Sequence, residues 1–198
     1  MKRALNSSLD LIGNTPKIKL QKIVPENAAD VWLKYEAVNP TGSYKNRIGN
    51  EITKQLGDKI DILCASVGTG GAIMGAWKGL RKAIPKIELV AFEPLQSPLL
   101  TTGKGGAHQV EGIGVGFKPP FLDQSVLTEI RAIDQGKAFV MCRQLAHEGG
   151  VFCVTSTGLN VVGAIELAKE IGPGKRVVTF ACDSGLKYLG TNVYLKKN

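Results

Sequence analysis

The strongest constraint on the fold is a repeated succession of short apolar runs and amphipathic helical segments. Continuous apolar runs at residues 59–67, 86–94 and 175–183 have the length of buried strands. Helical patterns lie between these runs at residues 72–83, 135–148 and 158–171. Strands that are apolar along their whole length need cover on both faces, which is the condition of a parallel sheet between helices. The sequence therefore predicts an α/β fold with a doubly wound, mainly parallel sheet.

Three further segments complete the expected order of elements. Residues 16–20 and 30–37 alternate apolar and polar side chains, which is typical of half-buried strands. Residues 149–157, "GGVFCVTST", are expected to form a strand that runs into a turn. No internal repeat and no linker divides the chain, so residues 1–198 are expected to form a single domain.

Composition excludes several classes of function. The formal net charge is +8, but Lys and Arg are spread along the chain and aromatic residues are few, so no nucleic-acid-binding pattern is present. The four cysteines have no spacing typical of a metal site. The first ten residues lack the apolar segment of a signal peptide, and no run is long enough to span a membrane. We expect a cytoplasmic protein whose partners include no metal, no nucleic acid and no membrane.

Residues 65–75, "ASVGTGGAIMG", join a buried strand to a helix through a glycine-rich turn. Successive backbone amides at a helix start attract anions, above all a phosphate group. The dinucleotide pattern G-x-G-x-x-G fails because Ile73 stands where its third glycine would be. The nucleotide P-loop pattern also fails, because Gly75 is followed by Ala76 and Trp77 where the pattern has Lys and then Ser or Thr. The turn indicates a site for one phosphate monoester, and the open alternative is a tight turn without a ligand.

A second candidate is Lys45, in the stretch "NPTGSYKNRIGNEITKQLGD" at residues 39–58. Ser43 is a plausible helix N-cap and residues 48–56 carry an apolar stripe, so Lys45 is expected on the first turn of a helix. The partial positive charge of a helix start disfavours an ammonium group and favours a neutral amine or an imine. The alternative is an ordinary solvated lysine.

A phosphate cradle and a placed lysine together describe the attachment points of pyridoxal 5′-phosphate, which carries one phosphate and an aldehyde that condenses with an amine. A third group is expected near the pyridine nitrogen of this cofactor. Ser156 lies at the expected junction of a strand and a helix, where it could serve. The alternative for Ser156 or Thr157 is a plain helix N-cap.

The chain resembles the cysteine synthase / cystathionine β-synthase family, which are fold-type II pyridoxal-phosphate enzymes related to the tryptophan synthase β chain. The matching stretches occur in the family's order and cover nearly the whole chain. They are "LIGNTP" (11–16), "NPTGSYKNR" (39–47), "VGTGGAIMG" (67–75), "EP" (93–94), "HQVEGIGVGFKPP" (108–120), "TSTGLNVVGAIELA" (155–168) and "DSGLKYLGT" (183–191).

The resemblance implies a role for each candidate residue. Lys45 would form the Schiff base with the cofactor and act as the general base at the substrate Cα, and Ser156 would hydrogen-bond the pyridine nitrogen. The glycine loop at residues 112–116 would line the substrate side. The cofactor phosphate would be bound by the glycine-rich turn, at Gly68, Thr69, Gly70 and Gly71.

Three departures from the family's pattern stand out. Asn46 replaces an aspartate, and Ala72 replaces a threonine of the phosphate loop. The loop Thr/Ser-x-Gly-Asn/Ser-Thr-Gly, which binds the substrate carboxylate in the family, is absent. After "KNRIG" the chain passes directly into a segment that resembles the helix beyond the family's small mobile domain. We therefore expect an internally truncated chain, in which a small domain of ~100 residues is missing near residues 48–51.

Three functions are compatible with this pattern. The first is a β-replacing or β-eliminating enzyme, cysteine synthase-like and homodimeric, which acts on serine, O-acetylserine or cysteine with sulfide or another thiol. The second is a non-catalytic cofactor-binding remnant or regulatory partner that has lost the carboxylate loop. The third is one half of a split enzyme that another chain completes.

Overall fold

The computed structural model describes residue 7 and residues 11–39, 47–191, 193 and 194. Strands and helices alternate along most of this length. In chain order the elements are β1 (Lys17–Leu20), β2 (Asp30–Tyr35), the 3-10 helix η2 (Glu36–Val38), α1 (Ile48–Leu56), β3 (Ile62–Ser66), α2 (Gly71–Arg81), β4 (Glu88–Pro94), α3 (Leu99–Thr102), η3 (Gln124–Val126), β5 (Glu129–Ile133), α4 (Gln135–Gly149), α5 (Thr155–Ile171), β6 (Arg176–Ala181) and η4 (Gly185–Tyr188).

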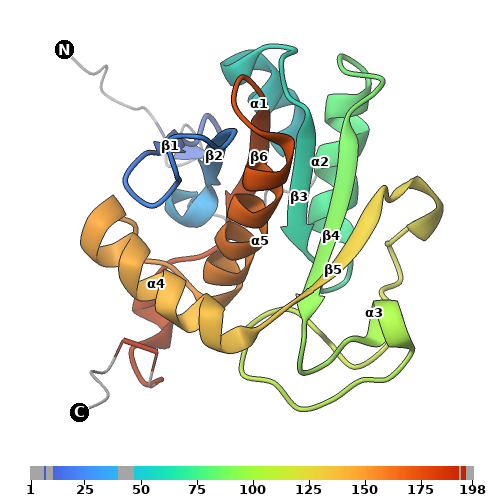
Figure 1. The fold of residues 1–198 in the computed structure, drawn as a ribbon, viewed down its shortest axis with the longest axis vertical. Helices are drawn as coiled ribbons and strands as arrows, with labels where there is room; N and C mark the ends of the chain where they lie inside the picture. The colour runs from blue at the N-terminus through green and yellow to red at the C-terminus, as the bar shows by residue number, and fades with distance from the viewer. Residues whose placement is uncertain (1–6, 8–10, 40–46, 192, 195–198) are drawn as a thin grey trace.

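The six strands form one sheet in the order β1-β2-β6-β3-β4-β5 (Figure 1). β1 pairs with β2 in the antiparallel sense at one edge, and all other neighbours in the sheet are parallel. The carboxyl ends of the parallel strands therefore meet at one edge of the sheet. This arrangement confirms the mainly parallel sheet that the apolar runs predict.

Two apolar layers enclose the sheet, one on each face. α4 and α5 cover one face, where Leu145 and Leu159 are fully buried. α1 and α2 cover the other face with Ile52, Ile73 and Leu80 (Figure 1). Burial of each such side chain contributes roughly 1.5–3 kcal/mol, so both helical layers are needed to hold the sheet. The doubly wound arrangement is confirmed.

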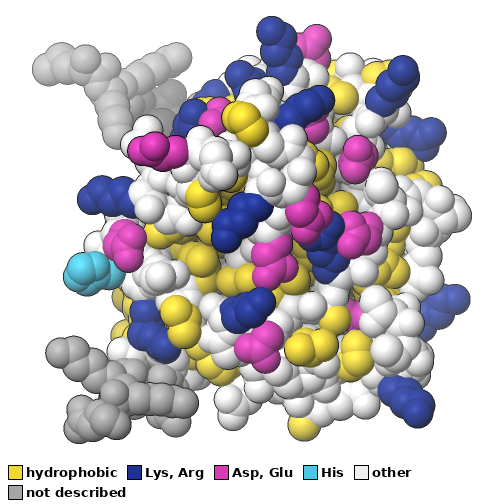
Figure 2. Space-filling view, viewed as in Figure 1, with side chains coloured by type: hydrophobic (Ala, Val, Ile, Leu, Met, Phe, Trp, Pro, Cys, Tyr) yellow, Lys and Arg dark blue, Asp and Glu magenta, His cyan; other side chains and the backbone are white. Residues whose placement is uncertain are grey.

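The surface carries charges of both signs. Figure 2 shows Lys and Arg side chains interspersed with Asp and Glu over one face of the molecule, where they form no continuous basic patch. Within the described residues, no helix combines the length and the apolar character that a membrane span requires.

Two parts of the fold differ from the sequence-based expectation. β5 has no apolar run because it lies at the sheet edge, where Arg131 forms ion pairs with Glu129 and Glu170. Residues 149–157 do not form a strand of the sheet, so that prediction is wrong. Cys153 makes only an isolated bridge with Ser184, and α5 already begins at Thr155.

Helices α1 and α2 pack with their backbones in contact. A Cβ atom added to Gly49 would lie 2.9 Å from Gly79 Cα and 3.1 Å from Leu80 N. Atoms this close cannot be accommodated without moving one helix, because both near neighbours belong to the backbone. The glycine at position 49 thus sets how deeply α1 can pack against α2.

We predict that Gly49→Ala destabilises the protein by about 1–3 kcal/mol, because the added methyl group overpacks the α1–α2 contact. Asn50→Ala is the matched control, since Asn50 is exposed on the same helix. The free energies of unfolding can be compared by urea denaturation. Equal stability of the two variants would contradict the close contact.

Candidate functional site

The candidate site lies where β3 and β6 part. The two strands pair only at Ile62–Val177 and Leu63–Val178, although β3 continues to Ser66 and β6 to Ala181. Beyond this point the chain leaves β3 toward α2 on one face of the sheet. It leaves β6 toward the segment that packs with α4 and α5 on the other face. Such a topological switch point is where parallel sheets bind ligands, and a cavity of about 360 Å³ opens here.

The glycine-rich turn between β3 and α2 forms one wall of this cavity. Gly70 adopts φ +86°, and a Cβ on it would lie 2.7 Å from Leu122 N. A Cβ on Gly68 would lie 2.7 Å from Gly112 O, so the turn requires glycine at both positions. The structure brings together all four residues predicted to bind phosphate, since the cavity is lined by Gly68, Thr69, Gly70 and Gly71.

The amides of this turn are available to a ligand. In the part of the chain that the structure describes, no protein acceptor engages the backbone N–H groups of residues 68–72. α2 begins at Gly71 and runs for 11 residues, so the partial positive charge of its amino end adds to these donors. The turn can therefore bind an anion without a lysine or arginine.

Ser156 faces the same cavity from the first turn of α5. The N-cap of α5 is Val154, without a side-chain cap, so the alternative that Ser156 or Thr157 serves as the N-cap is wrong. Ser156 is only 5% exposed, and its hydroxyl has no protein partner among the described residues. The Ser156 hydroxyl is not among the fully buried polar atoms, so it is accessible from the cavity, where a ligand can hydrogen-bond to it.

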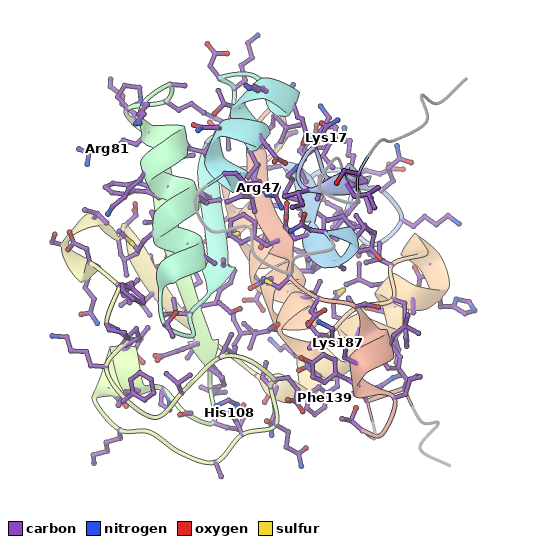
Figure 3. The ribbon with its side chains drawn as sticks, turned by 180° about the vertical axis from the view of Figure 1, so that it is seen from behind. Lys17, Arg47, Arg81, His108, Phe139 and Lys187 are labelled. Atoms are coloured by element: carbon purple, nitrogen blue, oxygen red, sulfur yellow. The ribbon has the colours of Figure 1, made fainter. Side chains whose placement is uncertain are left out.

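The loop that follows α3 forms a further wall. His108 Nε2 donates to Gly114 O at 2.9 Å, and this clasp holds the loop closed on itself (Figure 3). Glu111 N donates to Thr155 Oγ1 at 2.8 Å, which fastens the loop to the start of α5. The loop predicted to line the substrate side, residues 112–116, thus lies at the cavity, which it lines with Gly112, Ile113 and Val115.

Several other residues of the wall had no role predicted from the sequence. Cys182 and Asp183 follow β6 directly, and Tyr188 lies in η4 just beyond them. Asp183 accepts hydrogen bonds from Ser184 N at 2.8 Å and Lys187 Nζ at 3.0 Å, which stabilise this turn. Their position directly after a buried parallel strand is the signal that could have identified them.

Lys45 lies outside the described residues, so its position on the first turn of a helix stays a prediction. The described helix α1 begins at Ile48, with Arg47 as its N-cap residue. Arg47 Nη2 lies 2.6 Å from Glu36 Oε2, and Arg47 Nη1 lies 2.5 Å from Glu51 Oε1 (Figure 3). The chain at Arg47, two residues after Lys45, is thereby fixed to both η2 and α1.

A buried lysine completes this charge cluster. Lys34 is 1% exposed, and its Nζ donates to Glu51 Oε2 at 3.0 Å, to Gln55 Oε1 at 3.0 Å and to Thr15 O at 2.6 Å. Burial lowers the pKa of Lys34 below its ordinary value. Burial raises the pKa of Glu51, but hydrogen bonds from Arg47 and Lys34 outweigh this effect and lower the pKa below its ordinary value. The two cations and the carboxylates of Glu36 and Glu51 balance in charge.

The residues present fit pyridoxal phosphate. The free amides at residues 68–72 suit its phosphate, and the unpartnered Ser156 hydroxyl suits its pyridine nitrogen. The described residues hold no cluster of His, Cys, Asp and Glu that could bind a metal ion.

The sequence profile of the family described as "Pyridoxal-phosphate dependent enzyme" matches residues 46–183. The chain belongs to this family. Enzymes of the family depend on pyridoxal phosphate, in agreement with the cofactor that the sequence predicts.

Within this family, the chain is similar to curated cysteine synthases. The cysteine synthase of Staphylococcus aureus is 41% identical over 147 residues, which are 74% of this chain and 47% of the relative. Cysteine synthase B of Campylobacter jejuni is 31% identical over 194 residues, which are 98% of this chain and 60% of the relative. The chain therefore spans about half the length of the curated relatives it matches.

Solved structures agree with this placement. O-acetylserine sulfhydrylase isoform 3 from Entamoeba histolytica superposes with a TM-score of 0.89, covering 100% of this chain and 93% of that chain. Its 20% sequence identity shows the fold alone. A hydrogen sulfide-producing enzyme from Fusobacterium nucleatum gives a TM-score of 0.72 at 34% identity, covering 82% of this chain and 49% of that chain. The tryptophan synthase β-like fold expected from the resemblance is confirmed.

We predict that Glu51→Gln destabilises the protein by roughly 2 kcal/mol at pH 7, because Lys34 and Arg47 lose a partly buried carboxylate partner. The folded-state pKa of Glu51 is lowered from its ordinary value. The stabilisation is therefore complete above the unfolded-state pKa and disappears as the pH falls through the lowered folded-state value.

Urea unfolding of both proteins between pH 3 and 7 measures this difference (roughly the range where carboxylates titrate). Glu166→Gln removes an exposed ion pair with Lys137 and serves as the control, with an expected effect below about 1 kcal/mol. A Glu51→Gln effect that is independent of pH would contradict the charge cluster.

We also predict that Gly70→Ala weakens pyridoxal phosphate binding by about tenfold or more, because the turn must distort to relieve backbone strain and the contact with Leu122. Gly116→Ala carries the same strain at φ +75° but meets no atom within 4 Å, so its affinity should match the wild type. Fluorescence titration with the cofactor distinguishes the two. An equal loss of affinity in both variants would show that backbone strain alone weakens binding, and would contradict a phosphate site at Gly70.

Proposed function

We propose that this chain is a pyridoxal-phosphate-dependent, cysteine synthase-like enzyme. It would replace or eliminate the β-substituent of serine, O-acetylserine or cysteine, with sulfide or another thiol as the incoming nucleophile. The observation that carries the proposal is one cavity lined by both the free amides of residues 68–72 and the unpartnered hydroxyl of Ser156. The cysteine synthase relatives at 41% and 31% identity support the reaction class.

The residues divide the work as follows. Bound in the cavity, the cofactor supplies an electron sink for bond changes at the substrate Cα and Cβ. The amides of residues 68–72 and the amino end of α2 would hold its phosphate, and Ser156 would face its pyridine nitrogen as a neutral partner. A neutral partner moderates the electron sink, which suits β-elimination and replacement.

Lys45 would carry out the proton transfer. Its amine would hold the cofactor in the cavity and, once released, would take the proton from the substrate Cα. The β-substituent leaves with its bonding electrons, and the thiol sulfur forms the new bond at Cβ. Arg47, held by Glu36 and Glu51, fixes the chain two residues beyond Lys45.

We further propose that the family's small domain is missing between residues 48 and 51. The short span of this chain relative to its curated relatives supports an internal loss. Phe117 and Phe121, on the loop beside the cavity, are 54% and 65% exposed, as expected where a covering domain is lost. Without such a cover, water exclusion and orientation of the substrate carboxylate would fall to other residues around the cavity.

Assembly and location complete the proposal. We expect a homodimer and a cytoplasmic protein. The four cysteines are all free thiols in the structure, which suits a reducing compartment. Light scattering at several protein concentrations measures the assembly.

The experiment that tests the proposal is titration of the purified protein with pyridoxal phosphate. We predict a visible absorbance band from the lysine-bound cofactor in the wild type and its loss in Lys45→Ala. Lys54→Ala, which removes an exposed lysine of α1, is the matched control and should keep the band. A band that persists in Lys45→Ala would assign the lysine elsewhere.

Addition of O-acetylserine and sulfide to the loaded protein then tests turnover. Formation of cysteine supports the enzyme. A Lys45-dependent band that never responds to any of the three amino acids would instead support the non-catalytic remnant. Turnover that appears only after a second protein is added would support the split enzyme.

A further inference from the structure

Asn160 is a buried amide at the switch point that the proposed chemistry does not use. It lies on α5, four residues after Ser156, so the two side chains share one face of the helix. Asn160 is 0% exposed, and both ends of its amide are engaged. Its Nδ2 donates to Phe180 O at 3.0 Å, and its Oδ1 accepts from Ser66 N at 2.7 Å.

These two bonds join the strands where the sheet itself no longer does. β3 and β6 pair only at Ile62 and Leu63 of β3, whereas Ser66 and Phe180 lie beyond that pairing and both line the cavity. The amide of Asn160 takes the place of the missing ladder bonds between the parted strand ends. It thus gives the Ser66 N–H an acceptor and the Phe180 carbonyl a donor at the point where the two strands have separated.

The same amide fixes the two proposed anchors of the cofactor relative to each other. Ser66 lies two residues before Gly68, where the phosphate cradle begins, and Asn160 lies one helical turn from Ser156. A 2.7 Å hydrogen bond between Ser66 and Asn160 therefore ties the cradle to the helix that carries the Ser156 hydroxyl. Glycine contacts hold α5 itself in place, since a Cβ on Gly158 would lie 2.6 Å from Cys142 Sγ.

We propose that Asn160 is a positioning residue of the cofactor site, which sets the separation between the phosphate cradle and Ser156 by bridging the parted ends of β3 and β6. The proposal rests on the proposed function, because it concerns the same cofactor. Its alternative is that Asn160 only satisfies the buried backbone and leaves the cofactor unaffected.

Two substitutions separate the bonds. Asn160→Leu keeps the branch at Cγ, although leucine is the larger residue, and removes both hydrogen bonds. Asn160→Asp keeps the acceptor for Ser66 N but can donate to Phe180 O only when the carboxyl group is protonated. Leu167→Ala is the control, because Leu167 is buried near the far end of α5, ~16 Å along the helix from Ser156, and its truncation destabilises the same helix.

The first measurement is cofactor affinity by absorbance and fluorescence titration. We expect Asn160→Leu to raise the Kd for pyridoxal phosphate about tenfold and to shift the emission of the bound cofactor. Leu167→Ala should bind within about twofold of the wild type despite its loss of stability. For Asn160→Asp, the ratio of its Kd to that of the wild type should fall toward one as the pH is lowered, because protonation restores the donor to Phe180 O.

The second measurement needs no cofactor. In the cofactor-free protein, hydrogen exchange at the Ser66 amide should be slow in the wild type and in Asn160→Asp, and fast in Asn160→Leu. Slow exchange in Asn160→Leu would show that the bridge does not exist.

The outcomes distinguish the two proposals. If the wild type binds cofactor through Lys45 but Asn160→Leu binds it with unchanged Kd and emission, the positioning role is overturned and the proposed function stands. If the wild type shows no Lys45-dependent binding, the proposed function fails and the positioning role fails with it. If Asn160→Leu does not fold, the pH dependence of the Asn160→Asp ratio decides alone, and a constant ratio overturns the role.

Discussion

The separation of β3 from β6 creates the cavity and determines which groups must enclose it. Their backbones pair over two residues and then diverge, so the carboxyl ends of two central strands no longer satisfy each other. A sheet can tolerate this only where other groups take over the hydrogen bonds and the volume. Here Asn160 takes over hydrogen bonds, and the glycine-rich turn, the loop clasped by His108 and the turn at Asp183 enclose the remaining space.

Helix α5 holds the walls of the cavity in place relative to one another. It contacts β4 so closely that a Cβ on Gly163 would lie 2.5 Å from Phe92 Cζ. Almost all of its residues are buried, and its first turns bear Thr155, Ser156 and Asn160. From one rigid helix, Thr155 accepts a hydrogen bond from the loop, Ser156 offers a hydroxyl to a ligand, and Asn160 hydrogen-bonds to both strands. Sites carried by rigid elements hold their geometry better than sites built from loops alone.

Local patterns were sufficient to predict much of this arrangement. The apolar runs predict the parallel strands, because a strand buried on both faces must be apolar throughout. The turn at Gly68 and Gly70 was recognisable because close backbone approach demands glycine there. Other parts depend on contacts between distant segments and had no local signal. The bonds of Asn160 span 94 and 20 residues of sequence, and β5 lacks an apolar run because it is an edge strand.

Helix α1 joins two stretches that resemble segments lying far apart in the family's sequence. Its charge cluster depends on the helical register across that junction. Arg47 reaches Glu51 because four residues make about one helical turn, and Ile48 and Ile52 face α2 for the same reason. One residue more or fewer at the junction would rotate everything beyond it by about 100°. The buried Lys34 would then lose its contacts with Glu51 and Gln55 and keep the more distant carboxylate of Glu36, at 4.0 Å. The junction therefore tolerates changes in length only in whole helical turns, or as a segment large enough to end one helix and begin another.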